Sequence, residues 1–201
     1  MIEMREEKTI SGQRVTTRAL TESALLIAAA TVLSLIKIFE APYGGSVTLG
    51  SMIPIILISL KYPFSWSLTT ALAYALIQML FGFYAPPVEN FIYYSLMVYL
   101  DYLIAFGVLS LAGPLYRAMK DSRSARVRMM TAAIICFILR FVCHFVSGII
   151  IWNTYAPEGQ PVWLYSLLYN GSYMLCECLI SGVILFVAGQ KLADIFIGNK
   201  S

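Results

Sequence analysis

The chain has 201 residues, of which 59% are hydrophobic and only 12% are charged, and its formal net charge is +3. Soluble domains are about a quarter charged, so a soluble fold of this size would lack polar surface. The same numbers exclude an intrinsically disordered chain. They also exclude a nucleic-acid binder, because no basic cluster opposite aromatic residues forms a phosphate track. The composition therefore predicts a polytopic membrane protein.

Six apolar segments are candidates for membrane-spanning helices, each of which needs about 20 mostly apolar residues. They lie at residues 19–38, 47–60, 64–84, 91–116, 129–152 and 164–190. The first lacks a small-residue cleavage site, so we interpret it as a retained helix rather than a signal peptide. The second is short and contains Pro54, which predicts a kink or a tilt. The first half of the fourth is unusually polar, so this segment can form two pieces.

The basic residues predict the orientation of this bundle through the positive-inside rule. Twelve of the fourteen lysines and arginines lie before the first segment, in the loops after the second and the fourth, or after the sixth. We therefore expect an all-α integral membrane protein, a six-transmembrane-helix bundle with both termini in the cytoplasm. Residues 1–18 and 192–201 would be cytoplasmic tails, and residues 19–191 a membrane domain with a substrate pocket at its outer face.

Ionisable side chains inside the apolar segments need an explanation, because they are costly in lipid. We interpret Glu22 as a first-turn acid that is favoured by the helix dipole and pairs with Thr21 or Arg18. Arg140 and Glu177 fall near the middle of the hydrocarbon layer if each residue rises about 1.5 Å along its helix. We expect these two to pair with each other or with another buried polar group, as a structural clamp rather than a substrate contact.

The outer half of the fifth segment carries three residues at helical spacing, His144, Gly148 and Trp152. The glycine would leave a notch between the imidazole and the indole that a flat ring can enter. An ordinary packed helix with an interfacial tryptophan explains the same spacing, and the stripe alone does not decide between the two interpretations.

Further polar and aromatic residues fall at the same depth on neighbouring segments. They are Tyr165, Tyr169, Asn170 and Tyr173 on the sixth segment, and Asp101 and Tyr102 on the fourth. Tyrosines alone can belong to an interfacial aromatic belt, but a buried amide needs partners and can bond the edge of a heterocycle. A carboxylate among aromatic faces suits a flat organic cation. The set therefore predicts a binding pocket rather than a catalytic site.

Sequence motifs for enzymatic chemistry are absent. The chain contains no GxxxxGK[ST], no HExxH, no GxSxG and no cysteine and histidine spacing typical of a metal site, and it has a single histidine. We therefore expect no enzymatic activity, no metal and no cofactor. The absence of a strong internal repeat weakens a secondary carrier built from inverted repeats.

Two more features concern motion and partners. The outer loop at residues 39–52 contains three glycines and is either a mobile lid or an ordinary connector. Ala24 and Ala28, four residues apart on the first segment, would let another helix approach closely. That helix can belong to the bundle itself or to a partner protein.

Four stretches of the sequence are specific enough to suggest a family. They are TESALLIAAA at 21–30, GGSVTLGSMIPI at 44–55, LDYLIAF at 100–106 and LRFVCHFVSGIIIWNTYAPEGQPVWLYSLLYNGSYM at 139–174. In these stretches, and more weakly from about Leu20 to Lys191, the chain resembles the thiamin-specific S-components (ThiT/YuaJ family) of energy-coupling factor (ECF) transporters. The resemblance implies a six-helix bundle in the bacterial plasma membrane that holds thiamin near the outer face, under the loop joining the first two helices.

The resemblance also implies a substrate-binding role for eight positions, which are Tyr84, Asp101, Tyr102, His144, Gly148, Trp152, Tyr165 and Asn170. Asp101 would meet the cationic ligand, Trp152 would stack on it and Tyr102 would contact its hydroxyethyl end. The aminopyrimidine would be bound by His144, Tyr165 and Asn170. Tyr93 is the alternative to Tyr84 as the tyrosine that precedes the fourth segment.

The function that the resemblance implies is capture of thiamin at the outer face by a subunit that does not hydrolyse ATP. Its partners would be the lipid bilayer, a transmembrane T-component that docks on Ala24 and Ala28, and two ATPases that power import, with no nucleic acid. The alternatives are an S-component for another vitamin or a thiamin precursor, and a stand-alone small-molecule carrier.

Overall fold

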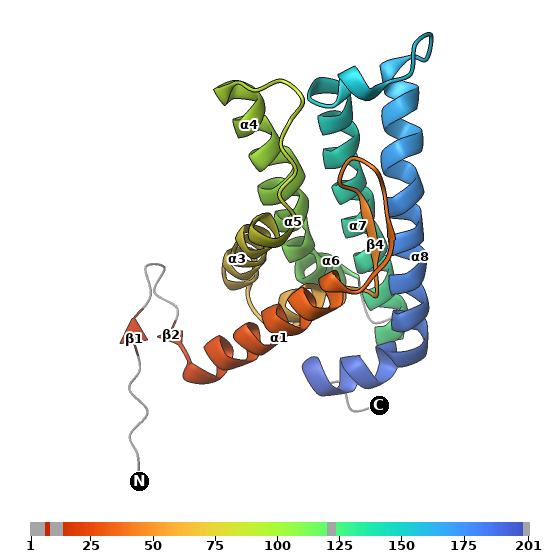
Figure 1. The fold of residues 1–201 in the computed structure, drawn as a ribbon. Helices are drawn as coiled ribbons and strands as arrows, with labels where there is room; N and C mark the ends of the chain where they lie inside the picture. The colour runs from red at the N-terminus through yellow and green to blue at the C-terminus, as the bar shows by residue number, and fades with distance from the viewer. Residues whose placement is uncertain (1–6, 9–13, 120–123, 199–201) are drawn as a thin grey trace.

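The computed structural model describes residues 7–8, 14–119 and 124–198, which form a mainly helical fold (Figure 1). Parts of both predicted tails, and the basic residues Arg5, Lys120, Arg123 and Lys200, lie outside the described residues. The long helices are α1 (Thr17–Leu35), α3 (Phe64–Gly82), α7 (Ala125–Ile150) and α8 (Val162–Phe196). The two hairpins pair β1 (Glu7–Lys8) with β2 (Arg14–Val15), and β3 (Lys37–Glu40) with β4 (Ser46–Thr48).

Five helical stretches among the described residues are long and apolar enough to cross a membrane. They are the four long helices and the stretch Phe91–Ala118, and each overlaps a predicted segment. The remaining segment, predicted at residues 47–60, does not form a helix of that length. Its beginning is strand β4, and helix α2 (Ile53–Lys61) contains only nine residues.

Helix α2 lies in the interior of the molecule, and every residue from Ile53 to Leu60 is buried. Pro54 occupies its first turn, where the missing N–H leaves no intrahelical bond unmade, so the proline starts the helix instead of kinking it. Gly113 donates its N–H to Ser59 Oγ at 2.8 Å, and Ser59 Oγ donates to the Ser110 carbonyl at 2.6 Å. A Cβ at position 113 would collide with the Ser59 carbonyl, so the glycine lets the two backbones approach.

The stretch Phe91–Ala118 is continuous, but its helical pitch changes along its length. In order, it consists of α4 (Phe91–Met97), the π-helical η1 (Val98–Ile104), α5 (Ala105–Gly107), the 3-10 helical η2 (Val108–Leu111) and α6 (Ala112–Ala118). The two pieces that its polar first half suggested are thus joined without a break. Asp101 lies in the middle of the π-helical segment, a conformation that is frequent at functional sites.

Charged residues meet at the end of the bundle where α1 begins and α8 ends (Figure 1). Lys61, at the end of α2, forms an ion pair of 2.5 Å with Glu22 of α1 and lies 5.7 Å from the ring centroid of Phe196 in α8. Glu22 also pairs with Arg18 at 2.8 Å, as predicted, although it lies beyond the first turn of α1.

Helices α7 and α8 run side by side, and the β3–β4 hairpin lies against α8 (Figure 1). Its strands are antiparallel, with Lys37 opposite Thr48 and Glu40 opposite Ser46. Most of the predicted loop at residues 39–52 is therefore a hairpin and its turn. Because β3 begins at Lys37, α1 ends at Leu35, three residues before the predicted boundary at Ile38.

Candidate functional site

A cavity of about 310 Å³ lies between the β3–β4 hairpin, η1, α7 and α8. All eight residues singled out as substrate contacts line it, namely Tyr84, Asp101, Tyr102, His144, Gly148, Trp152, Tyr165 and Asn170. Tyr93, the alternative to Tyr84, is not among the residues that line this cavity. The structure thus brings together residues that are as much as 86 positions apart, from Tyr84 to Asn170.

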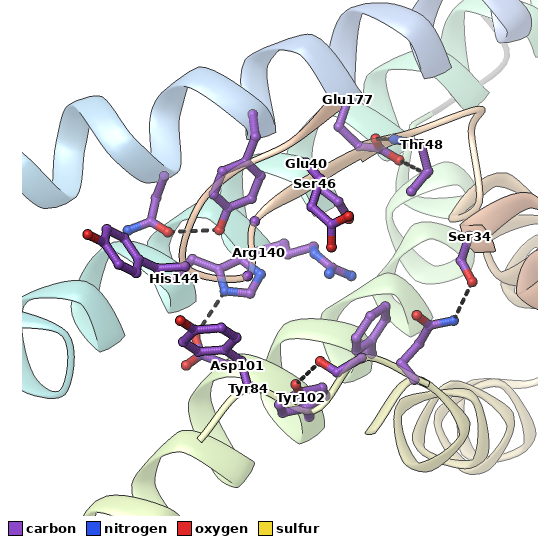
Figure 2. A pocket seen from close by; sticks show the side chains of 18 of the residues that line it. Ser34, Glu40, Ser46, Thr48, Tyr84, Asp101, Tyr102, Arg140, His144 and Glu177 are labelled. Carbon is purple, nitrogen blue, oxygen red and sulfur yellow. Dashed lines mark hydrogen bonds and ion pairs between the residues drawn. The ribbon is translucent and has the colours of Figure 1, made fainter. Parts of the chain in front are cut away.

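The carboxylate of Asp101 is held by three side chains of the α7 region. Its Oδ1 lies 3.0 Å from His144 Nδ1, and its Oδ2 accepts hydrogen bonds from Ser147 Oγ at 2.6 Å and from Trp152 Nε1 at 3.1 Å. Figure 2 shows the Asp101 carboxylate and the His144 imidazole directed toward each other in the wall of the cavity. Ser147 was not singled out in the sequence, although it lies one helical turn after His144, on the face that meets Asp101.

The predicted notch at Gly148 is filled by α8. A Cβ at this position would collide with Ser166 Oγ and would come within 2.8 Å of Asn170 Nδ2, so the space is too small for a ring. The glycine instead lets α8 pack closely against α7. It brings Asn170 to the cavity, where its Nδ2 donates to Ser166 and its Oδ1 accepts a hydrogen bond of 2.8 Å from Tyr173.

Aromatic rings are stacked in a row beside the cavity, and three of them, Tyr43, Tyr84 and Trp152, line it. Trp152 lies beyond the end of α7, in the turn that leads into η3 (Asn153–Tyr155), and its ring stacks on Tyr155 with centroids 6.2 Å apart. The ring centroid of Tyr84 lies 5.8 Å from that of Trp152. Tyr43 of the hairpin stacks on Tyr155 with ring centroids 4.1 Å apart. Tyr155, which does not itself line the cavity, links the rings of Tyr43 and Trp152; it was not singled out in the sequence because it lies in a turn outside any helical stripe.

The β3–β4 hairpin is attached to α8 at both of its ends. At the tip, the backbone N–H groups of Tyr43 and Gly45 donate to Tyr169 Oη at 3.0 and 3.5 Å. At the base, Glu177 accepts hydrogen bonds of 2.6 Å from both the N–H and the Oγ1 of Thr48. A Cβ at position 45 would come within 2.5 Å of the Tyr173 ring, so this glycine serves close packing. The hairpin is therefore an ordered cover of the cavity.

Tyr102 and Tyr165 line the cavity from opposite elements. The Tyr102 hydroxyl donates to the Gly82 carbonyl at 2.8 Å, which ties η1 to the end of α3. Tyr165 stacks on Tyr169 of the same helix with centroids 5.6 Å apart. These contacts orient both rings along the cavity wall.

The expected ion pair between Arg140 and Glu177 does not form. Both carboxylate oxygens of Glu177 bond to Thr48, so the alternative expectation of another buried polar partner holds for Glu177. The Arg140 guanidinium carbon lies 3.9 Å from the centroid of the Phe106 ring instead. Glu177 is directed toward Thr48, whereas the Arg140 guanidinium lies in the middle of the cavity, a difference in direction that residue depth alone does not predict (Figure 2).

The other predicted sites lie away from this cavity. Ala24 and Ala28 are exposed on α1, beside the exposed side chains of Leu20 and Leu25. Within the described ranges, no group of three or more histidine, cysteine, aspartate or glutamate residues is placed to hold a metal ion. The side chains that line the cavity offer charge, ring stacking and hydrogen bonding.

Comparison with known proteins identifies relatives over most of the chain. The family model described as "Thiamine transporter protein (Thia_YuaJ)" matches residues 20–197. The chain is 32% identical over 174 residues to the thiamine transporter ThiT of Bacillus subtilis, a match that covers 83% of this chain and 87% of the relative. A thiamine transporter ThiT of Lacticaseibacillus paracasei is 34% identical over 101 residues, which are 45% of this chain and 50% of that protein.

Solved structures agree with the sequence comparison. ThiT from Listeria monocytogenes matches with a TM-score of 0.70 and 25% identity, covering 89% of this chain and 97% of that chain. The S component of a bacterial ECF transporter matches in fold, with a TM-score of 0.56 and 17% identity over 89% of this chain and 96% of the other. The predicted resemblance is confirmed: this chain is a multi-pass bacterial membrane protein and belongs to the thiamine transporter protein (Thia_YuaJ) family.

Proposed function

We propose that this protein is the thiamin-binding S-component of an ECF-type importer. It captures thiamin at the outer face of the plasma membrane and delivers it inward when it is coupled to a transmembrane T-component and two ATPases. Membership of the family, the names of its relatives and the S-component fold support this proposal. The chain itself supplies binding and no ATP hydrolysis.

The observation that carries the proposal is the environment of Asp101. Its Oδ1 lies 3.0 Å from His144 Nδ1, and its Oδ2 accepts hydrogen bonds from Ser147 and Trp152, so its neighbours fix the carboxyl group in the cavity wall. The thiazolium ring of thiamin has a permanent positive charge and no N–H at its charged nitrogen. Such a ring needs a negative charge and aromatic faces rather than a free hydrogen-bond acceptor. Asp101, with the Trp152 ring beside it, offers this combination.

The remaining contacts orient the ligand along the cavity. Asn170 presents an amide, and His144 an imidazole whose Nε2 has no hydrogen-bond partner among the described residues. An aminopyrimidine offers ring nitrogens and an amine that complement such groups. We therefore place the aminopyrimidine at His144, Tyr165 and Asn170, the thiazolium at Asp101 and Trp152, and the hydroxyethyl end beside Tyr102. Tyr84 covers the ligand from the mouth, and Gly148 keeps α8 close enough for Asn170 to reach it.

The membrane arrangement follows the same reasoning. We place both termini in the cytoplasm, because the basic residues of the α2–α3 and α6–α7 connections and of the chain ends belong on that side. The buried α2 then counts as the sixth helix of the bundle. Ala24 and Ala28 form a small-residue surface on α1 against which the helix of a T-component can pack.

Binding measurements on the purified protein test the proposed site. We expect Asp101→Asn to weaken thiamin binding strongly, because the substitution removes the negative charge and keeps the size of the side chain. Trp152→Ala should also weaken it, since the ring face and an Asp101 hydrogen bond are both lost. Quenching of tryptophan fluorescence and isothermal titration calorimetry report the affinity. If both variants bind thiamin as tightly as the wild type, the site is wrong.

Competition and uptake experiments distinguish the alternatives. Aminopyrimidine and thiazole fragments should each displace thiamin weakly from an S-component for thiamin, whereas a precursor transporter would bind one fragment best. Uptake of thiamin in a host that lacks every ECF coupling subunit would support a stand-alone carrier and contradict the proposed dependence on partners. Mass spectrometry of the molecule that co-purifies with the protein identifies the ligand directly.

A further inference from the structure

Arg140 is a buried cation inside the cavity that the proposed thiamin contacts do not use. Its side chain is 9% exposed and lines the cavity from α7, one helical turn before His144. Figure 2 shows its guanidinium in the middle of the cavity, between Asp101 and Tyr102 on one side and Glu177 and Thr48 on the other. A buried charge with no counter-charge in contact destabilises the folded protein.

Two of the three guanidinium nitrogens of Arg140 have no acceptor among the described residues. Its Nε and Nη1 are buried and have no hydrogen-bond partner among the described residues. The contact with Phe106 uses the face of the guanidinium, whereas the N–H groups lie in its plane, so this contact leaves the donors unmet. Each buried donor without an acceptor destabilises the ligand-free protein.

The three carboxylates that line the cavity each have partners other than Arg140. Asp101 accepts from Ser147 and Trp152, Glu177 accepts from Thr48, and Glu40 pairs with Lys37 at 2.6 Å. The Tyr102 hydroxyl donates its proton to Gly82, so it can offer the ligand only a lone pair. The hydroxyethyl oxygen of a ligand placed beside Tyr102 would therefore lack a strong donor unless Arg140 supplies one.

We propose that Arg140 is a specificity-determining residue that donates to an oxygen acceptor at the hydroxyethyl end of the ligand. The inference rests on the proposed binding of thiamin, and it adds a residue that recognises the end of the ligand opposite the aminopyrimidine. Charge also fixes the orientation, because the thiazolium is attracted to Asp101 and repelled by Arg140. The acceptor is the free hydroxyl of thiamin or the phosphate of a thiamin phosphate ester, both of which suit a guanidinium.

A cycle that changes both the ligand and the residue tests this role. The affinities of thiamin, thiamin monophosphate and deoxythiamin, in which a hydrogen replaces the hydroxyl, are measured by calorimetry for the wild type and for Arg140→Met. Loss of a hydrogen bond from a charged donor should weaken binding of the acceptor-bearing ligands about 10- to 100-fold. Deoxythiamin, which has no acceptor at that end, should change much less. Arg126→Met, on the same helix but outside the cavity, is the matched control and should change none of the three affinities.

The pattern of losses decides the outcome. A larger loss for thiamin than for deoxythiamin supports recognition of the hydroxyl, and a loss confined to the monophosphate supports recognition of a phosphate. Equal losses for all three ligands, or no loss, would overturn the proposal, because a purely structural role does not distinguish them. If Arg140→Met does not fold, Arg140→Gln, which also removes the charged donor, permits the same comparison. Failure of the wild type to bind any of the three ligands would instead contradict the proposed function.

Discussion

At the scale of single residues, Gly148 shows how a side chain that is absent organises the site. A methyl group at this position would meet Ser166 and Asn170, which belong to the facing helix. We expect Gly148→Ala to destabilise the protein by about 1–3 kcal/mol, as overpacking does elsewhere, and to weaken ligand binding because Asn170 must move. The midpoint of thermal unfolding and the thiamin affinity, measured in the same detergent, check both effects.

Gly182→Ala is the matched control for that substitution. Gly182 also lies in a helix, but a Cβ there would have no neighbour within 4 Å. Alanine should therefore leave binding unchanged and raise stability slightly, since it restricts the unfolded chain. A Gly148→Ala protein that matched Gly182→Ala in both stability and affinity would show that the close packing of α7 and α8 is not required.

The side-chain chemistry of the site could be predicted from the sequence, but some of its geometry could not. Helical spacing put His144 and Asn170 at the same depth, and the structure brings both to one cavity. Spacing does not give the rotation of one helix against another, so the separation of Arg140 from Glu177 was missed. Residues in turns, such as Tyr155, belong to no periodic pattern and leave no signal of this kind.

At the scale of elements, the bond between Thr48 and Glu177 holds the base of the hairpin to α8. Thr48→Val keeps the shape of the side chain and removes the Oγ1 bond to Glu177, whose carboxyl is buried in the cavity wall. We expect a loss of about 1–3 kcal/mol in stability, because a buried acceptor loses one of its two donors. The hairpin should also open more readily, which faster hydrogen exchange of residues 37–48 would reveal.

Thr69→Val provides the comparison for Thr48→Val. Thr69 lies on α3, is exposed, and bonds only the Ser65 carbonyl of its own helix through Oγ1. The same chemical change there should alter the unfolding midpoint and the exchange of the hairpin very little. If the two variants behave equally, the bond between Thr48 and Glu177 does not hold the hairpin to α8.

The elements that departed from prediction did so for physical reasons. The segment at residues 47–60 is apolar enough to suggest a span, but α2 is apolar because protein surrounds it on all sides, not because lipid does. The β3–β4 hairpin lies in a stretch with three glycines, and the first two of these lie in its turn or pack against a ring. Composition reports burial, and it does not tell whether the surroundings are lipid or protein.

At the scale of the whole molecule, the docking surface proposed on α1 is distinct from the cavity. Ala24 and Ala28 are exposed on α1 and are not among the residues that line the cavity. We expect the double substitution of both alanines by leucine to leave thiamin affinity within about twofold of the wild type, since no contact in the cavity changes. Association with the T-component and uptake of thiamin in cells should be lost, because the larger side chains keep a partner helix away.

Val183→Leu tests whether any added bulk on the surface has this effect. Val183 is 63% exposed on α8, so leucine there adds a methylene to a surface position outside α1. Co-purification with the coupling subunits should be retained in this variant. Normal assembly and uptake in the alanine-to-leucine protein would remove α1 as the docking surface.

The order of charged and apolar segments along the chain also belongs to this scale, and it is the basis of the predicted topology. Basic residues alternate with apolar segments, so a bundle of antiparallel helices would bring them to one end, the end at which Lys61 and Glu22 meet. Their grouping needs only the order of the segments and not the packing between them. The packing, by contrast, depends on contacts such as that of Gly113 with Ser59, which join residues far apart in the chain.

The π-helical segment at Val98–Ile104 makes the site depend on the number of residues in the chain as well as on their identity. Each residue of an α-helix turns the chain by about 100°, so a single deletion that restored regular winding would rotate Asp101 out of phase with His144 by that amount. Every site residue would still be present, and the cavity would still have its walls, but the carboxylate would point elsewhere. Removal of Tyr99 alone should therefore abolish thiamin binding in a protein that still folds. A rotation of the helix would then abolish binding without any substitution of a residue that lines the site.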